Sequence, residues 1–145
     1  MFKFTIIVTL FAIVAASDNI RFHDCANHEI SSINFSGCTS EDRECKLYKG
    51  KDNIFKVHFT ANQDSPTVKL EMLATIGGIE IPVPGLETDA CKGHVKCPLV
   101  KGEKYDFVYN FNLPVAFPNV HAVVVTKLVG SNGVLTCGKM NGVLV

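Results

Sequence analysis

The sequence predicts an all-β fold, an immunoglobulin-like antiparallel β-sandwich of two sheets. Apolar and polar residues alternate with a period of two along several short segments, which is typical of half-buried strands. Turn residues such as Gly, Pro and Asn separate these segments at short intervals, and no segment of ten residues or more has helical periodicity. Seven or eight such strands in one chain of this length are typical of a sandwich.

The first 17 residues are expected to be a signal peptide. Lys3 supplies a positive charge, residues 4–14 form an apolar run too short to span a bilayer, and Ala15-Ala16-Ser17 offers small residues for cleavage. Cleavage after Ser17 leaves residues 18–145, with cleavage after Ala16 as the alternative. We therefore expect a secreted, extracellular protein with one domain over residues 18–145, since no linker or internal repeat follows.

Strands are expected first at residues 20–23, 30–35, 54–60 and 68–76. In the third of these, Phe55, Val57 and Phe59 share one face. Residues 79–83 predict an edge strand, because proline cannot donate to a ladder of hydrogen bonds. A short helical turn is expected at residues 87–90.

The later strands are expected at residues 105–113, 120–129 and 134–145. Residues 105–113 alternate most clearly. Residues 120–129 are almost continuously apolar, which predicts a strand covered on both faces. Asn132-Gly133 predicts a hairpin turn before the last strand.

Six cysteines follow the expected signal peptide, and an even number in a secreted chain predicts disulfides rather than a metal site. Cys38 and Cys45 could close one small loop and Cys91 and Cys97 another, which would leave Cys25 for Cys137. Six cysteines allow 15 pairings, and spacing alone does not decide among them. No Cys-x-x-Cys pair occurs and the histidines are scattered, so no metal site is predicted.

Charge and motifs limit the function. The 14 basic and 14 acidic residues balance, which argues against nucleic-acid binding. No Gly-x-Ser-x-Gly motif occurs. His23 beside Asp24 is interpreted as an ordinary pair of surface residues and not as a catalytic dyad, so no enzyme is predicted. Asn34-Phe35-Ser36 is a possible N-glycosylation site.

Residues 81–105 are interpreted as a rigid gate between an edge strand and the most aromatic strand. Pro82 and Pro84 would stiffen it. Its basic side chains are either a solvated loop or a rim that meets anionic lipid headgroups on a membrane surface. These side chains are Lys92, His94, Lys96, Lys101 and Lys104.

Several segments make the chain resemble the mite group 2 allergens, which belong to the Niemann–Pick type C lipid-recognition family of ML domains. The segments are residues 24–30, 61–63, 83–85, 96–102 with Tyr105-Asp106, and 133–138. The resemblance implies a hydrophobic cavity between the two sheets and the disulfides Cys25–Cys137, Cys38–Cys45 and Cys91–Cys97. It also implies a lipid ligand, namely a sterol, fatty acid, phospholipid or lipopolysaccharide, with neither catalysis nor a cofactor.

The predicted function is therefore to carry an apolar lipid between the sheets. The expected wall of the lipid cavity consists of Phe55, Val57, Phe59, Leu70, Met72, Ile81, Val83, Tyr105, Tyr109, Phe111 and Val124. The alternative is a non-enzymatic interaction module, a sandwich without ligand whose loops bind a receptor or matrix partner.

Overall fold

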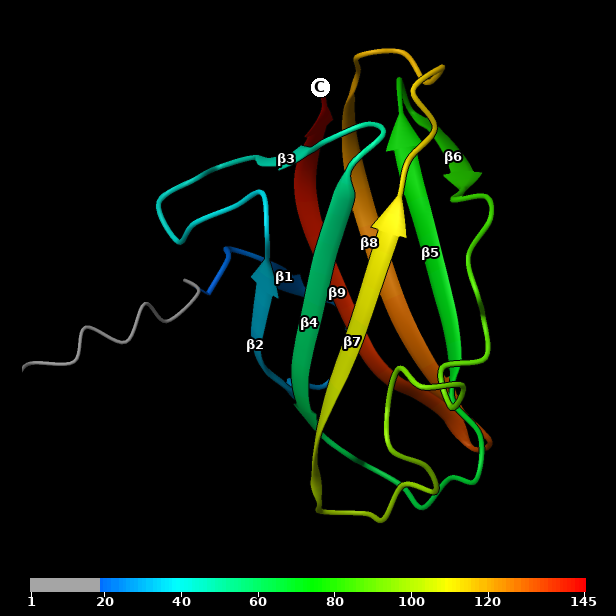
Figure 1. Cartoon of the computed structure of the whole chain (residues 1–145). Helices are drawn as coiled ribbons and strands as arrows, with labels where there is room; N and C mark the ends of the chain where they lie inside the picture. The colour runs from blue at the N-terminus through cyan, green and yellow to red at the C-terminus, as the bar shows by residue number, and fades with distance from the viewer. Residues whose placement is uncertain (1–18) are drawn as a thin grey trace, which may run out of the picture.

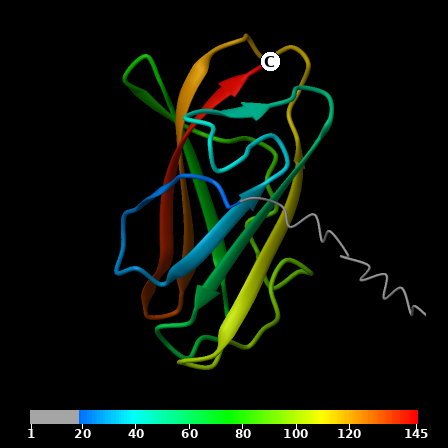
Figure 2. The same cartoon turned by 90° about the vertical axis from the view of Figure 1, so that its left-hand side faces the viewer.

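The computed structural model describes residues 19–145, so the expected signal peptide lies outside the described residues. These residues form two sheets that face each other, which the side view in Figure 2 shows as two layers. The six-stranded sheet contains β1 (His23–Asp24), β3 (Cys45–Leu47), β5 (Lys69–Ile76), β6 (Ile79–Pro82), β8 (His121–Gly130) and β9 (Gly133–Leu144). The three-stranded sheet contains β2 (Ile30–Phe35), β4 (Asp52–Thr60) and β7 (Lys104–Asn112).

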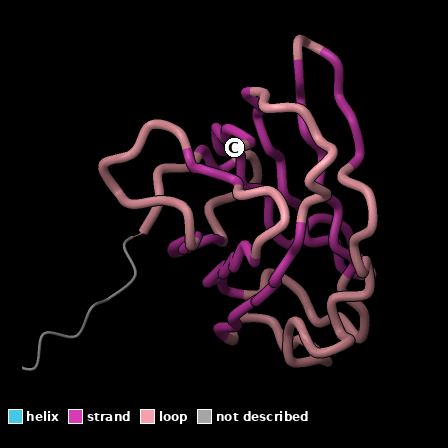
Figure 3. Tube along the Cα trace, turned by 45° about the horizontal axis from the view of Figure 1, so that its top comes forward, coloured by secondary structure: helices cyan, strands magenta, loops and turns pink. Residues whose placement is uncertain are grey.

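The predicted all-β sandwich is confirmed. Figure 3 shows only strands and loops in the described part of the chain. Strands β4 and β7 pair over their full length, and buried residues alternate with more exposed ones along both. Strand β6 is the edge strand expected from its prolines. Over residues 19–145 there is no helix long and apolar enough to cross a membrane.

Two local predictions were wrong, and one strand was missed. Strand β8 is not covered on both faces, because its outward residues Val123 and Val125 remain partly exposed. Residues 87–90 form no helical turn, since Asp89 pairs with Lys69 in an isolated bridge. Strand β3 was missed, and it pairs with β9 in parallel rather than antiparallel fashion.

The two ends of the sandwich differ. The upper end in Figure 1 carries β6, the β7–β8 connection (residues 113–120) and the C-terminus. The lower end carries the β8–β9 turn and residues 86–103, which we call the lower loop. Below the midpoint the sheets are fully packed together by large side chains. Leu70, Leu128, Phe59 and Phe107 meet there, each at most 1% exposed.

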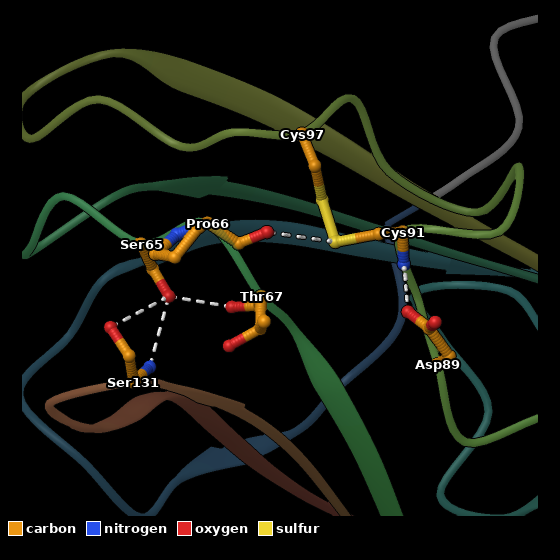
Figure 4. The surroundings of a disulfide bond; sticks show 7 residues. All are labelled: Ser65, Pro66, Thr67, Asp89, Cys91, Cys97 and Ser131. Atoms are coloured by element: carbon orange, nitrogen blue, oxygen red, sulfur yellow. Dashed lines mark hydrogen bonds between the residues drawn. A yellow bond between two sulfur atoms is a disulfide. The ribbon is translucent and has the colours of Figure 1, made fainter.

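A disulfide closes the lower loop internally, and backbone hydrogen bonds attach the loop to its neighbours; Figure 4 shows the surroundings of this disulfide. Its Cys91–Cys97 disulfide lies beside the turn before β5, where the Cys91 sulfur is 3.7 Å from the Pro66 carbonyl oxygen. Ser65 donates a hydrogen bond of 2.6 Å from its hydroxyl to the Thr67 carbonyl and accepts one of 2.9 Å from the Ser131 backbone. This end of the molecule is therefore closed.

The cysteines pair as the family resemblance implied. Cys25–Cys137 joins the residue after β1 to the middle of β9, across 112 positions of sequence. Cys38–Cys45 closes the loop that leads into β3, and Cys91–Cys97 closes part of the lower loop. All six cysteines are bridged. The first disulfide is the one that links distant parts of the chain.

We expect the two kinds of disulfide to contribute differently to stability. On the chain-entropy model, a loop of 112 positions contributes about 5 kcal/mol and one of 7 positions about 2 kcal/mol. Cys25→Ser/Cys137→Ser should therefore lower the free energy of unfolding by more than twice as much as Cys38→Ser/Cys45→Ser. Urea unfolding of both variants measures this, and equal losses would contradict it.

Candidate functional site: an apolar cavity between the sheets

A cavity of about 520 Å³ lies between the two sheets in the upper half of the sandwich. Both sheets contribute to its wall, as does the β7–β8 connection. Nearly all of the side chains in the wall are apolar. They are Leu47, Phe55, Met72, Ala74, Ile76, Ile81, Pro82, Val83, Pro84, Phe111, Leu113, Phe117, Pro118, Val120, Ala122, Val124, Thr126, Met140 and Leu144.

The cavity lies where the inward side chains become small. Along the paired strands β5 and β8, the lowest inward pair is Leu70 with Leu128, and both are fully buried in the packed half. The next pairs toward the upper end are Met72 with Thr126 and then Ala74 with Val124. Ala122 follows on β8, and its partner on β9 is Gly142. Alanine leaves space that leucine fills lower down, whereas the space beside Gly142 is taken by the Leu47 side chain.

Aromatic rings form the opposite wall. Phe55 on β4 and Phe111 on β7 face the cavity from the three-stranded sheet. Phe35 on β2 supports both rings, with centroids 6.2 Å from Phe55 and 6.0 Å from Phe111. These contacts fix the rings in place, so this wall is rigid and apolar.

The cavity opens between two segments at the upper end, which we call the mouth. Four wall residues are also exposed to solvent: Ile81, Pro82 and Pro84 at β6, and Pro118 in the β7–β8 connection. Lys49 holds this connection, donating from its Nζ to the Phe117 carbonyl oxygen at 2.7 Å and to the Asn119 side chain. His121 and Glu44 also pair at this end, at 2.6 Å.

Six of the predicted cavity residues lie in the wall and five do not. The six are Phe55, Met72, Ile81, Val83, Phe111 and Val124. The five that do not line the cavity are Val57, Phe59, Leu70, Tyr105 and Tyr109. Those five point inward as predicted but lie nearer the lower end, where the sandwich is filled.

Tyr105 and Tyr109 have a structural role that explains their position. The Tyr109 hydroxyl accepts a hydrogen bond of 2.7 Å from the Glu87 backbone, and its ring stacks on His94 at 4.5 Å. The Tyr105 hydroxyl accepts one of 2.7 Å from the Val100 backbone. Both tyrosines therefore anchor the lower loop instead of facing a ligand.

Sequence reasoning missed the small residues of the wall. Ala74 and Ala122 occupy inward positions of strands that were predicted correctly, so a fall in side-chain size along each strand was the available signal. Leu47 and Leu144 were missed because their positions depend on the pairing of β3 with β9, and Met140 was missed although it pairs with the predicted wall residue Val124 on β8. Phe117 belongs to a connection with no strand pattern.

The gate predicted over residues 81–105 was only partly correct. Its first residues, Ile81–Pro84, do lie at the mouth. The rest is the lower loop, which bridges to the segment before β5 through Ser65 and Leu99 at the opposite end. The basic side chains of the loop are therefore remote from the mouth, so of the two alternatives the solvated loop agrees with their position and the rim does not.

Asn34 lies in a polar cluster on the outer face of the three-stranded sheet. Its Nδ2 donates to the Asn19 side chain at 3.2 Å, and its Oδ1 accepts from His58 Nε2 at 2.8 Å. The other ring nitrogen of His58 pairs with Asp106. Asn34 is only 9% exposed, so a glycan on its nitrogen would displace these partners.

Asp24 does not orient His23 as a catalytic dyad would require. Its Oδ1 accepts hydrogen bonds from the backbone nitrogens of Ala26 and His28, at 2.9 and 3.3 Å, and so stabilises the turn after β1. His23 itself is exposed. In residues 19–145 no group of three His, Cys, Asp or Glu side chains is placed to hold a metal ion.

Fold and cavity together define a β-sandwich with an apolar binding space between its sheets. The family model described as the ML domain matches residues 19–142. The chain is 45% identical to mite group 2 allergen Der f 2 of Dermatophagoides farinae over 134 residues, 90% of each chain. It is 39% identical to Lep d 2 of Lepidoglyphus destructor over 142 residues, 98% of each chain. The protein therefore belongs to the ML-domain family.

A solved structure supports the same fold. The Niemann-Pick type C2 protein from Japanese carpenter ant superposes with a TM-score of 0.80, at 21% sequence identity. The superposition covers 87% of this chain and all of that one. At this level of identity the similarity concerns the arrangement of the strands.

We expect two neighbouring inward residues of β5 to differ in their contribution to stability. Leu70 is surrounded by packed side chains, so Leu70→Ala should cost about 2–5 kcal/mol. Met72 already borders an open space, so Met72→Ala should cost about 1–2 kcal/mol in the ligand-free protein. Urea unfolding of both variants measures the difference, and a larger loss for Met72→Ala would show that the upper half is also packed.

We also expect Asn34 to carry no glycan in protein from a eukaryotic secretory host. The reason is its burial and its hydrogen bonds to Asn19 and His58. Peptide mass spectrometry of the segment around residues 34–36 measures occupancy. A folded protein with a glycan at Asn34 in most molecules would contradict this packing of β2.

Proposed function

We propose that the protein binds one lipid in the cavity between its sheets. The observation that carries the proposal is the composition of the wall, in which 18 of the 19 side chains are apolar and Thr126 is the exception. A cavity of about 520 Å³ also falls within the range of about 300–1,000 Å³ that is usual for small-molecule sites. A sterol, a fatty acid or another single-chain lipid has the matching chemistry.

Burial of apolar surface supplies the binding free energy. Each methylene group moved from water into the cavity contributes about 0.8 kcal/mol, so a long acyl chain or a ring system binds with few polar contacts. The wall side chains gain as well, because a ligand restores contacts that the empty space lacks. No cofactor is needed for this role.

The mouth provides a route for an apolar ligand. Ile81 is 44% exposed although it belongs to the wall, and Ile79 on the same face of β6 is 66% exposed. Val115 in the β7–β8 connection is 74% exposed. These exposed apolar side chains give the mouth a border that an apolar lipid can contact on its way into the cavity.

The proposal includes export of the protein. Residues 1–17 would act as a signal peptide and residues 18–145 as the mature ML domain. Three disulfides support this, because such bonds persist in oxidising compartments outside the cytosol. A secreted carrier also needs a covalent framework, since a hollow core contributes less packing than a filled one.

The test places a large ring inside or outside the cavity at adjacent positions of β8. Ala122 points into the cavity and Val123 points outward, so Ala122→Phe fills the space and Val123→Phe is its matched control. We expect Ala122→Phe to weaken binding of a neutral apolar probe such as 1-aminoanthracene about tenfold or more, and Val123→Phe to leave it unchanged. Fluorescence titration measures binding, and circular dichroism checks the fold.

Two results would contradict the proposal. One is a folded Ala122→Phe variant that binds the probe as well as the wild-type protein does. The other is wild-type protein from a eukaryotic secretory host that yields no lipid on organic extraction and does not bind the probe. That second result would favour an interaction module whose loops contact a protein partner.

A further inference from the structure

Residues 114–119, the middle of the β7–β8 connection at the upper end in Figure 1, form one side of the mouth, and we call them the lid. Phe117 and Pro118 belong to the wall of the cavity. Phe117 is half-buried and packs against the core, whereas the other lid residues are exposed. The lid therefore meets the interior of the sandwich through one aromatic side chain.

Few bonds hold the lid in place. Backbone hydrogen bonds fix the two residues that flank it, Leu113 and Val120. In the described part of the chain, the only hydrogen bonds between the lid itself and other segments come from the ammonium group of Lys49. It donates to the Phe117 carbonyl oxygen at 2.7 Å and to the Asn119 side chain. One side chain thus links the lid to the body of the protein.

Lys49 itself lies on a turn that is firmly held. The side chain of Asn53, which is 0% exposed, accepts a hydrogen bond of 3.0 Å from the Tyr48 nitrogen and donates one of 2.9 Å to the Tyr48 carbonyl. Gly50 follows and touches the lid, since a Cβ added there would lie 2.7 Å from a methyl carbon of Val115. The ammonium group therefore projects from a fixed turn onto a segment with few other bonds.

The opposite side of the mouth is held differently. Strand β6 pairs with β5 at four successive positions, so its displacement breaks part of a backbone ladder. Displacement of the lid breaks the two bonds from Lys49 and withdraws the Phe117 ring. A segment with fewer bonds opens at a lower free-energy cost. The lid is therefore the side of the mouth that moves when a ligand enters.

We propose that Lys49 is the latch of the lid, a positioning residue that sets the rate at which a ligand enters and leaves the cavity. This inference rests on the proposed lipid-binding function. Lys49 does not line the cavity, so its bonds stabilise the closed lid whether or not a ligand is bound. A contact that favours the closed state equally with and without ligand changes both rates by the same factor and leaves the affinity unchanged.

The test replaces Lys49 and measures both rates. Lys49→Met removes the ammonium group and keeps a side chain of similar length. Lys51→Met is its matched control, because Lys51 carries the same charge two residues away but lies over the Tyr48 ring, at 5.8 Å, and not on the lid. Asn119→Ala removes one of the two acceptors. Stopped-flow mixing of 1-aminoanthracene with each delipidated protein at several concentrations gives the association and dissociation rate constants, and circular dichroism checks the fold.

We expect Lys49→Met to raise both rate constants about three- to tenfold, as for the loss of about one hydrogen bond at a partly exposed site, with Kd changed by less than about twofold. Lys51→Met should leave both rate constants unchanged. Asn119→Ala should raise both about twofold, and it should add nothing in the Lys49→Met background, because its partner is already absent there.

The outcomes separate the latch from the function beneath it. If Lys49→Met exchanges the probe no faster than Lys51→Met, or raises only the dissociation rate constant and so weakens binding, the latch is wrong and lipid binding still stands. An Asn119→Ala effect that is undiminished without Lys49 would also contradict the latch. Should Lys49→Met fail to fold, unchanged rate constants in Asn119→Ala, at an exposed position, would overturn it instead. If the wild-type protein does not bind the probe, the proposed function fails and the latch fails with it.

Discussion

The packing of the lower half is the constraint on which the rest of the structure depends. Leu70 and Leu128 meet Phe59 and Phe107 there, and these side chains hold the two sheets at a fixed separation. Backbone hydrogen bonds between strands stiffen each sheet, but they do not set the distance between the two sheets. Because the lower half is filled, the upper half can stay hollow without collapse. A site of this kind needs a packed neighbour as much as it needs small residues.

The two ends of the sandwich differ in role: the lower end is held by many bonds, and the cavity opens at the upper end. The lower loop is closed internally by the Cys91–Cys97 disulfide and is joined to the body by Tyr105 and Tyr109 and by backbone bonds such as that from Leu99 to Ser65. The β7–β8 connection at the upper end has backbone bonds at its two ends, from Gly50 to Leu113 and from Leu144 to Val120, and between them the side chain of Lys49 holds it. A segment with fewer bonds opens at a lower free-energy cost. The opening of the cavity lies at the upper end, although the rigid, cysteine-bound loop was the stronger signal in the sequence.

Local patterns predicted most of the strands because alternation reports which face of a strand is buried. Strand β7 and the hairpin at Asn132-Gly133 are examples. The pairing of β3 with β9 was not predictable in this way, since three residues are too few to show alternation and their partner lies near the C-terminus. The position of the cavity was missed for a related reason. Tyr109 and Phe111 both point inward, but only non-local packing decides which of them meets empty space.

Selectivity in such a cavity depends on where its polar groups lie. An apolar wall distinguishes ligands weakly, because one methylene group more or less changes the binding free energy by about 1–3 kcal/mol, and an added hydroxyl is rejected little better. Shape therefore sets an upper limit on ligand size, which the aromatic wall of Phe55 and Phe111 enforces. A buried polar group acts differently, since it is left unpaired by any ligand that lacks a matching group. Among the described wall residues only Thr126 has a polar side chain, so the wall itself offers few groups for discrimination by chemistry, as opposed to size.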